Sequence, residues 1–172
     1  MSLAVRPEAG GDREAIRAVH LAAFPTSAEA DLVERLHSDL DSEISLVADQ
    51  AGEILGHVVL SRMAVTRGSH VVRALGLGPV AVLPGAQGGG IGSELIRSAL
   101  AIAGSLGEEL VFVLGDPDYY TRFGFSASAA EPFASPYAGP FFMALWLRPT
   151  DFGPAAGRAE YALAFAALET PR

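Results

Sequence analysis

The sequence predicts a mixed α/β (α+β) fold in which helices cover both faces of one central sheet. Two observations carry this prediction. Leu110–Leu114 is a run of five apolar residues without polar alternation, which is typical of a central strand buried on both faces. Val80–Ser93 reads VAVLPGAQGGGIGS, an apolar strand that passes through a glycine-rich turn into the start of a helix. The length of 172 residues, half of them apolar, predicts one domain over residues 1–172 with a sizeable core.

The first half of the chain is predicted to contain two helices followed by strands. Asp12 is a favoured residue type at a helix N-terminus, and Pro25 ends the helix that Asp12 begins. Gly52 marks the turn between two of the strands. The predicted elements in order are a strand at Leu3–Arg6, a helix with the apolar face Ile16, Val19, Ala23 and Phe24, a helix with Leu32, Val33, Leu36 and Leu40, and strands at Ile44–Ala48, Ile54–Val65 and Val71–Val82.

The second half is predicted to begin with a helix and to end in strands. From Ile91 to Leu106 the apolar residues recur every three or four positions, as on an amphipathic helix with one buried face. Residues 126–140 and 148–158 are rich in proline and glycine and are predicted to be loops. The remaining predicted elements are the strand Leu110–Leu114, a short helical segment at Tyr119–Phe123, and strands at Phe141–Leu147 and Glu160–Phe165.

Composition narrows the function classes. The net charge of −8, without a run of basic residues, argues against binding to nucleic acid or to an anionic membrane. The absence of cysteine excludes a thiol nucleophile and cysteine-ligated metals. No apolar run reaches about 18 residues and the N-terminus lacks a signal-peptide core, so we expect a cytoplasmic protein. The histidines have no metal-ligand spacing, so we expect no metal site and interpret His20, His37, His57 and His70 as surface or hydrogen-bonded residues.

The glycine-rich stretch is a candidate anion site. Its glycines at 85, 88, 89, 90 and 92 surround the start of the helix at Ile91. There the first N–H groups lack intrahelical partners, and the helix dipole favours negative charge. Glycine lets the loop take positive φ and lets a phosphate approach the backbone. A pyrophosphate fits this description, and a flexible turn that only reverses the chain is the alternative.

Two common phosphate-binding loops do not fit the stretch. A Walker loop needs Lys followed by Ser or Thr after its last glycine, whereas Ile91 and Gly92 follow Gly90. A Rossmann fingerprint has GxGxxG in a repeated βαβ array, whereas Gly88, Gly90 and Gly92 give GxGxG and no second βαβ half follows. The sequence thus excludes an ordinary P-loop NTPase and gives little support to a dinucleotide-binding fold.

Two motifs in order along the chain resemble the GNAT superfamily of acyl-CoA-dependent N-acyltransferases. VLPGAQGGGIGSELI is similar to motif A of that superfamily, with Gln87, Gly90 and Gly92 at its signature positions. VLGDPDYYTRFGF, residues 113–125, is similar to motif B, in which a tyrosine precedes a Gly-Phe pair by four residues. The order of the predicted elements also matches the GNAT fold. The resemblance implies a central mixed sheet of about six to seven strands, about four flanking helices, and a splay between the fourth and fifth strands.

The resemblance implies that acetyl-CoA is the cosubstrate. It places the pantetheine arm along the backbone of Val80, Ala81 and Val82, whose side chains also pack in the core. It assigns the N–H of Val80 to the thioester carbonyl as an oxyanion donor. The implied pyrophosphate-binding residues, with Gln87 closing the near side, are Gln87, Gly88, Gly89, Gly90, Ile91, Gly92 and Ser93.

Tyr120 matches the family tyrosine that borders the cofactor and protonates the departing CoA thiolate. A phenol suits this role because it is uncharged at rest. The alternatives are that Tyr120 only packs between helix and sheet, and that Tyr119 takes the acid role. Neighbouring residues are interpreted structurally: Phe123, Gly124 and Phe125 as packing, and Asp116 and Asp118 as helix caps.

The general base is not evident in the sequence. Some family members carry a Glu on the fourth strand, but Val71–Val82 has no carboxylate, and Gly76 stands four residues before Val80. Glu29, at the start of the second predicted helix, is the best substitute for binding or deprotonating an amine. The alternatives are that Glu29 is a solvated charge at a helix N-terminus, and that water is the base.

The sequence therefore predicts an N-acetyltransferase that moves an acetyl group from acetyl-CoA to a primary amine by direct attack in a ternary complex, without a metal. Val80, Tyr120 and Glu29 are its candidate catalytic residues. The predicted partners are acetyl-CoA and an amine acceptor, either a small molecule or a protein amine, and members of the family often form homodimers. The alternatives are a non-catalytic acyl-CoA-binding module on the same fold and, with less support, a nucleotide-binding enzyme.

Overall fold

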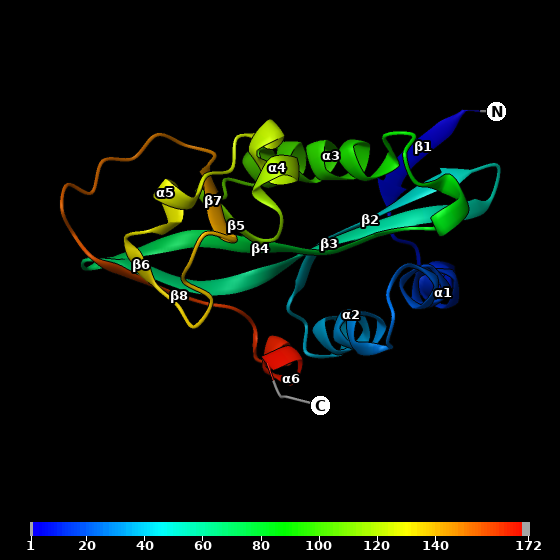
Figure 1. Cartoon of the computed structure of the whole chain (residues 1–172), viewed down its shortest axis with the longest axis horizontal. Helices are drawn as coiled ribbons and strands as arrows, with labels where there is room; N and C mark the ends of the chain where they lie inside the picture. Colours follow the sequence, from blue (N-terminus) through cyan, green and yellow to red (C-terminus); the bar gives the residue numbers. More distant parts are fainter. Residues whose placement is uncertain (1, 170–172) are drawn as a thin grey trace.

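The computed structural model of the chain describes residues 2–169 as a central sheet with helices on both faces (Figure 1). The strands are β1 (Leu3–Pro7), β2 (Ser42–Gln50), β3 (Glu53–Arg67), β4 (His70–Val82), β5 (Leu110–Leu114), β6 (Phe133–Ala134), β7 (Phe142–Trp146) and β8 (Gly157–Glu160). The helices are α1 (Arg13–Ala23), α2 (Ala28–Ser38), α3 (Ile91–Ser105), α4 (Pro117–Tyr120), α5 (Ala127–Ala130) and α6 (Ala166–Glu169). Single 3₁₀ turns cover Gly10–Asp12, Pro84–Ala86, Thr121–Phe123 and Leu163–Phe165.

The sheet is mixed and open. Its strands follow the order β1-β2-β3-β4-β5-β7, with β8 beside β3 and β6 beside β8. Along the main path only β4 and β5 run parallel, and the other pairs are antiparallel. This topology confirms the predicted mixed α/β fold. In the described residues the sheet has eight strands rather than six to seven, one of them the two-residue β6.

The departures from the predicted elements are concentrated in the last third of the chain. The predicted strand Glu160–Phe165 is wrong, because β8 ends at Glu160 and a 3₁₀ turn covers Leu163–Phe165. Ala164 in that turn is buried against α2. The predicted loop at 126–140 contains α5 and β6, and the hydroxyl of Ser126 caps α5 by accepting from the N–H of Ala129 at 3.2 Å. Local alanine content therefore outweighed the proline and glycine signals there.

Two details of the first helices also differ. Asp12 does not cap α1 with its side chain. Its carboxylate instead accepts from the N–H of Ala9 at 2.7 Å and pairs with Arg6. Leu40 lies beyond the end of α2, with φ of 61° and an exposed side chain, so it does not extend the apolar face of that helix.

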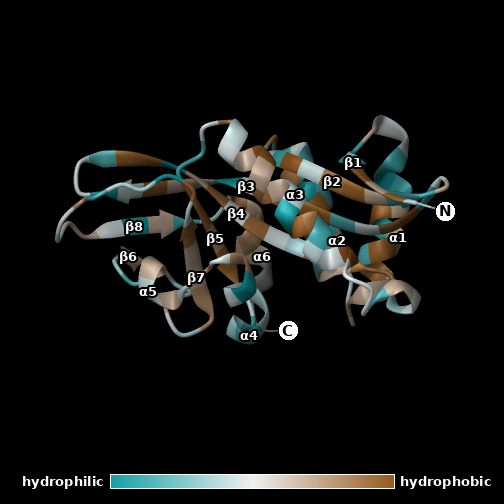
Figure 2. Cartoon of the chain, turned by 90° about the horizontal axis from the view of Figure 1, so that it is seen from above, coloured by the Kyte–Doolittle hydropathy of each residue, from teal (hydrophilic) through white to brown (hydrophobic). Residues whose placement is uncertain are grey.

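The core has two layers, one on each face of the sheet. α3 buries Leu95, Ile96, Ala99 and Ala103 against one face. The apolar sides of α1 and α2 pack on the opposite face. Figure 1 shows α3 and α4 on one side of the sheet and α1, α2 and α6 on the other. In Figure 2 the strand β5, which lies between β4 and β7, is brown, as expected for a strand covered on both faces.

The sheet splays between β4 and β5. Their pairing runs from Ala74 opposite Leu110 to Leu77 opposite Val113 and ends there, although β4 continues to Val82. At the same point β4 bulges, since Gly78 and Pro79 together face the single β3 residue between Val58 and Leu60. The β4 backbone from 78 to 82 therefore has an edge that no described strand covers.

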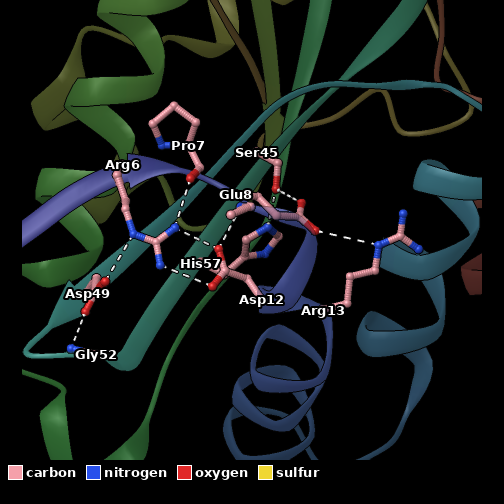
Figure 3. A network of polar contacts seen from close by, with 10 residues as sticks. Arg6, Pro7, Glu8, Asp12, Arg13, Ser45, Asp49, Gly52 and His57 are labelled. Carbon is pink, nitrogen blue, oxygen red and sulfur yellow. Dashed lines mark hydrogen bonds and ion pairs between the residues drawn. The ribbon is translucent and has the colours of Figure 1, made fainter.

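A chain of polar side chains leads from the buried His20 of α1 and His57 of β3 to the half-buried Ser45 and Glu8. His20 Nε2 lies 2.8 Å from His57 Nδ1, His57 Nε2 lies 2.7 Å from Ser45 Oγ, and Ser45 Oγ donates to Glu8 Oε2 at 2.6 Å. Figure 3 shows Glu8, Ser45 and His57 converging, with Arg13 beyond Glu8. The hydroxyl of Ser45 has one proton, which it donates to Glu8. His57 Nε2 therefore donates a hydrogen bond to Ser45 Oγ, and His57 Nδ1 accepts one from His20 Nε2. Nδ1 of His20 is buried and has no hydrogen-bond partner among the described residues.

Candidate active site

A cavity of about 590 Å³, the loop cavity, lies on the α3 face beside the free edge of β4. All the residues predicted to bind the cosubstrate line it except Ala81 and Gly89. The side chain of Ala81 packs toward α1 on the other face. The lining residues are Val80, Val82, Ala86, Gln87, Gly88, Gly90, Ile91, Gly92, Ser93, Tyr119, Tyr120 and Arg122.

The loop cavity has the features of an anion site. Gly88 and Gly90 take φ of 85° and 88°, which side chains disfavour. Gly90 is the N-cap of α3, and no described side chain caps the helix, so its first N–H groups have no partner among residues 2–169. The side chain of Gln87 donates to the carbonyl of Val82 at 3.0 Å and ties the loop to β4.

The cavity also holds one positive charge that the sequence reasoning did not single out. The guanidinium of Arg122 stacks 4.6 Å from the ring centre of Tyr119, and its Nε donates to the carbonyl of Tyr119 at 2.9 Å. It forms no ion pair with a carboxylate of the described residues. Arg122 follows Tyr119 by three positions in a helical segment, and side chains with this spacing are neighbours on a helix. The spacing could therefore have indicated from the sequence that Arg122 lies beside Tyr119.

The two adjacent tyrosines point to different places. The hydroxyl of Tyr119 lies 3.2 Å from the hydroxyl of Ser93, at the first turn of α3. Tyr120 extends into the splay and packs over Gly115, where an added Cβ would stand 2.5 Å from Cε2 of the ring. Burial, with a smaller contribution from Tyr119, raises the pKa of Tyr120 to about 12. The phenol is therefore protonated and uncharged at neutral pH.

A second cavity, the aromatic cavity, lies on the α2 face and has a volume of about 390 Å³. Val80 and Tyr120 line both cavities, so the two meet at the splay. Glu29, in the first turn of α2, lines the aromatic cavity. The full lining is Phe24, Glu29, Leu32, Leu77, Gly78, Pro79, Val80, Leu114, Tyr120, Tyr137, Tyr161 and Phe165.

The structure explains why β4 carries no carboxylate at position 76. A Cβ built on Gly76 would lie 2.5 Å from Cε1 of Tyr161. The ring of Tyr161 thus occupies the space that a side chain on β4 would fill. No local pattern in the sequence could indicate this contact, because it joins residues 85 positions apart and Tyr161 fell in the wrongly predicted strand.

Comparisons with known proteins show a family match and similar structures. Residues 4–128 match the family described as "Acetyltransferase (GNAT) domain". The uncharacterized N-acetyltransferase YjhQ of Escherichia coli K12 is 37% identical over 75% of this chain and 73% of its own. The structure is similar to that of Escherichia coli YhbS in complex with CoA, with a TM-score of 0.86 and 29% identity over 95% of this chain and 92% of that one.

A second solved relative carries the acetylated form of the cofactor. The Brucella melitensis GNAT family acetyltransferase in complex with acetyl-CoA has a TM-score of 0.78 and 33% identity, covering 95% of this chain and 98% of that one.

Within residues 2–169, no helix is both long and apolar enough to cross a membrane.

Proposed function

Because the chain belongs to the GNAT acetyltransferase family, we propose that it transfers the acetyl group of acetyl-CoA to a primary amine by direct attack in a ternary complex. The observation that carries this proposal is the meeting of the two cavities. The loop cavity suits a phosphate-bearing cosubstrate and the aromatic cavity suits an acceptor. They share Val80 and Tyr120, which lie where the two substrates would react.

The residues of the loop cavity fit CoA. The first turn of α3 and the positive-φ glycines offer N–H groups to the pyrophosphate. Arg122 adds a positive charge that can pair with a phosphate. The uncovered edge of β4 beyond Leu77 offers backbone groups that can pair with the amides of a pantetheine arm. Ser93 and Gln87 complete the loop side of the cavity.

In the proposed reaction, Val80 and Tyr120 act on opposite ends of the thioester. The N–H of Val80 stabilises the carbonyl oxygen as negative charge develops on it, whereas Pro79 has no proton to donate. A C–N bond forms and the C–S bond breaks. Tyr120 donates its proton to the departing sulfur, and the amine nitrogen releases one proton to Glu29 or to water. Because the pKa of Tyr120 is raised to about 12, the phenolate left behind takes up that proton at once, so the numbers of protons lost and gained are equal.

The test of this proposal measures CoA release in the presence of acetyl-CoA and single amines. We expect acetyl-CoA to raise the unfolding temperature, and at least one amine to raise CoA release above the rate of hydrolysis. Mass spectrometry of the amine should show one added acetyl group. Stabilisation by acetyl-CoA without amine-dependent release across a broad panel would instead favour the non-catalytic acyl-CoA-binding module.

Arg122→Ala is expected to raise the KM for acetyl-CoA about 3- to 10-fold with little change in kcat, because an exposed cation adds modest binding energy to a phosphate. The effect should shrink as salt is added. The matched control is Arg97→Ala, since Arg97 stacks on Phe123 at 5.2 Å but does not line the loop cavity. An equal rise in KM for both variants would count against a contact between Arg122 and the cosubstrate.

Gly115→Ala is expected to lower kcat about 10- to 100-fold, because the new Cβ displaces the ring of Tyr120, and a shift of about 1 Å can cost that much. Overpacking should also lower the free energy of unfolding by about 1–3 kcal/mol. Gly104→Ala is the control: Gly104 lies in α3, and a Cβ there meets nothing within 4 Å. Normal turnover of the Gly115 variant would show that the position of the Tyr120 ring is not critical.

A further inference from the structure

The aromatic cavity has an unusual balance of charge and apolar surface. Its walls include Phe24, Leu32 and Leu114, together with the rings of Tyr137 and Phe165. Its lining contains one carboxylate, that of Glu29, and neither arginine nor histidine. A ligand in this cavity therefore meets one negative group against largely apolar walls.

Two polar atoms of the lining are buried and lack a partner. Oε2 of Glu29 and the hydroxyl of Tyr161 make no hydrogen bond with any described residue. A buried polar atom without a partner is costly, and a carboxylate can only accept hydrogen bonds. A ligand that donates hydrogen bonds and carries positive charge satisfies Glu29, which a neutral hydroxyl compound does less well. An ammonium group is such a ligand.

The number of carboxylates limits the number of charges on the ligand. A second ammonium on the same molecule would lie against rings and aliphatic side chains without a carboxylate to compensate for its lost hydration. The remaining wall instead offers ring surface. The ring centres of Tyr161 and Phe165 are 4.8 Å apart, and those of Tyr137 and Tyr161 are 5.3 Å apart in a T-shaped arrangement. Such a cluster suits an aromatic body that adds one more edge or face.

We infer that the acceptor is a small monoamine whose amino group binds beside Glu29 and whose apolar, preferably aromatic, body packs against Tyr161 and Phe165. This inference rests on the proposed function, because it names the substrate class of the same site. It separates this chain from enzymes for polyamines or for lysine side chains in polar peptides.

The first experiment compares four acceptors in the CoA-release assay: 2-phenylethylamine, ethanolamine, spermidine and a lysine-containing peptide. We expect kcat/KM for 2-phenylethylamine to exceed each of the others by about tenfold or more. Ethanolamine isolates the contribution of the aromatic body, and spermidine isolates the penalty of extra charges. A higher value for spermidine or for the peptide would overturn the acceptor class and leave the proposed function intact. Acetyl-CoA binding without release by any amine would overturn the proposed function itself.

The second experiment uses inhibition constants against the best acceptor, so that it reports binding rather than turnover. N,N-dimethyl-2-phenylethylamine, which is cationic, and 2-phenylethanol, its uncharged hydroxyl analogue, are compared. We expect the native protein to prefer the cation about 10- to 100-fold, the range of a charge-assisted hydrogen bond.

Glu29→Gln should abolish this preference while acetyl-CoA still stabilises the fold. Glu34→Gln should retain the preference, because Glu34 lies on the same helix but pairs with Arg17 at 3.1 Å. If the native protein binds 2-phenylethanol as tightly as the cation, this result alone overturns the inference. An unchanged preference in a folded Glu29→Gln protein would overturn the role of that carboxylate.

Discussion

Tyr120→Phe is expected to lower kcat for acetyl transfer by about 10²- to 10⁴-fold, the range for loss of a general acid. The substitution removes one hydroxyl and keeps the ring that packs over Gly115. Binding of acetyl-CoA should therefore change little, and KM should stay within a few-fold of the native value. The measurement is kcat and KM with a saturating amine, together with the unfolding temperature. Turnover at the native rate would show that the phenol does not assist the leaving group.

Tyr119→Phe provides the comparison for this result. Its hydroxyl faces Ser93 at 3.2 Å in the loop cavity and does not reach the aromatic cavity. Loss of that hydroxyl should act on the KM for acetyl-CoA more than on kcat. If Tyr119→Phe instead lost kcat to the greater extent, the roles of the two tyrosines would be reversed.

Since burial raises the pKa of Tyr120 to about 12, the activity should show no alkaline loss below pH 10 from ionisation of this group.

Lowering the pH from 7.5 to 5.0 is expected to lower the free energy of unfolding by about 2–4 kcal/mol through the buried pair His20 and His57. Burial lowers the pKa of His20 from 6.5 to about 4. Burial, followed by repulsion from His20, lowers the pKa of His57 to about 3. A lowered folded-state pKa contributes stability above the unfolded value of 6.5. That contribution is lost as the pH falls toward 4 and 3, because the unfolded chain takes up the protons first.

The surroundings of this pair support the direction of the effect. His57 faces Ser45, which donates to Glu8, and Glu8 lies 3.9 Å from Arg13. No described carboxylate contacts either imidazole directly, so neither proton is stabilised by an adjacent charge. Protonation would also place charge on the inner nitrogen of His20, which has no partner.

Urea unfolding at both pH values tests this expectation. The double variant His20→Gln/His57→Asn should lose much less stability between pH 7.5 and 5.0 than the native chain. His37→Gln is the control, because His37 lies on α2 outside the buried pair. If the double variant lost as much stability as the native chain, other groups would be responsible for the acid sensitivity.

The sequence could predict those site elements that are formed by consecutive residues. The strand from Val71, the glycine-rich turn and the helix from Ile91 follow local rules of periodicity and glycine conformation. The structure has the same order, with β4 leading through the loop to α3. Asp116 was predicted as a helix cap, and its carboxylate accepts from the N–H of Asp118 at 2.9 Å at the start of α4. The roles of the individual site residues stay predictions.

Contacts between distant segments could not be predicted from one sequence. His20 and His57 lie on a helix and a strand that share no local pattern, and they become partners only when α1 packs on the sheet. The ring of Tyr161 fills the space above Gly76 because the chain leaves β8 and crosses beneath the splay toward α2. These positions are decided by tertiary packing, in which side-chain volume and the route of the connecting segments outweigh local propensity.

The splay between β4 and β5 forms an opening in the sheet at which the two cavities meet. The loop cavity lies on one face and the aromatic cavity on the other, and Val80 and Tyr120 form the common border. For the proposed reaction, the two substrates then approach from opposite sides and do not compete for one entrance. We therefore expect initial-rate kinetics in which either substrate can bind first. A bisubstrate compound that joins CoA to an apolar amine would have to thread this opening, with its linker between Val80 and Tyr120.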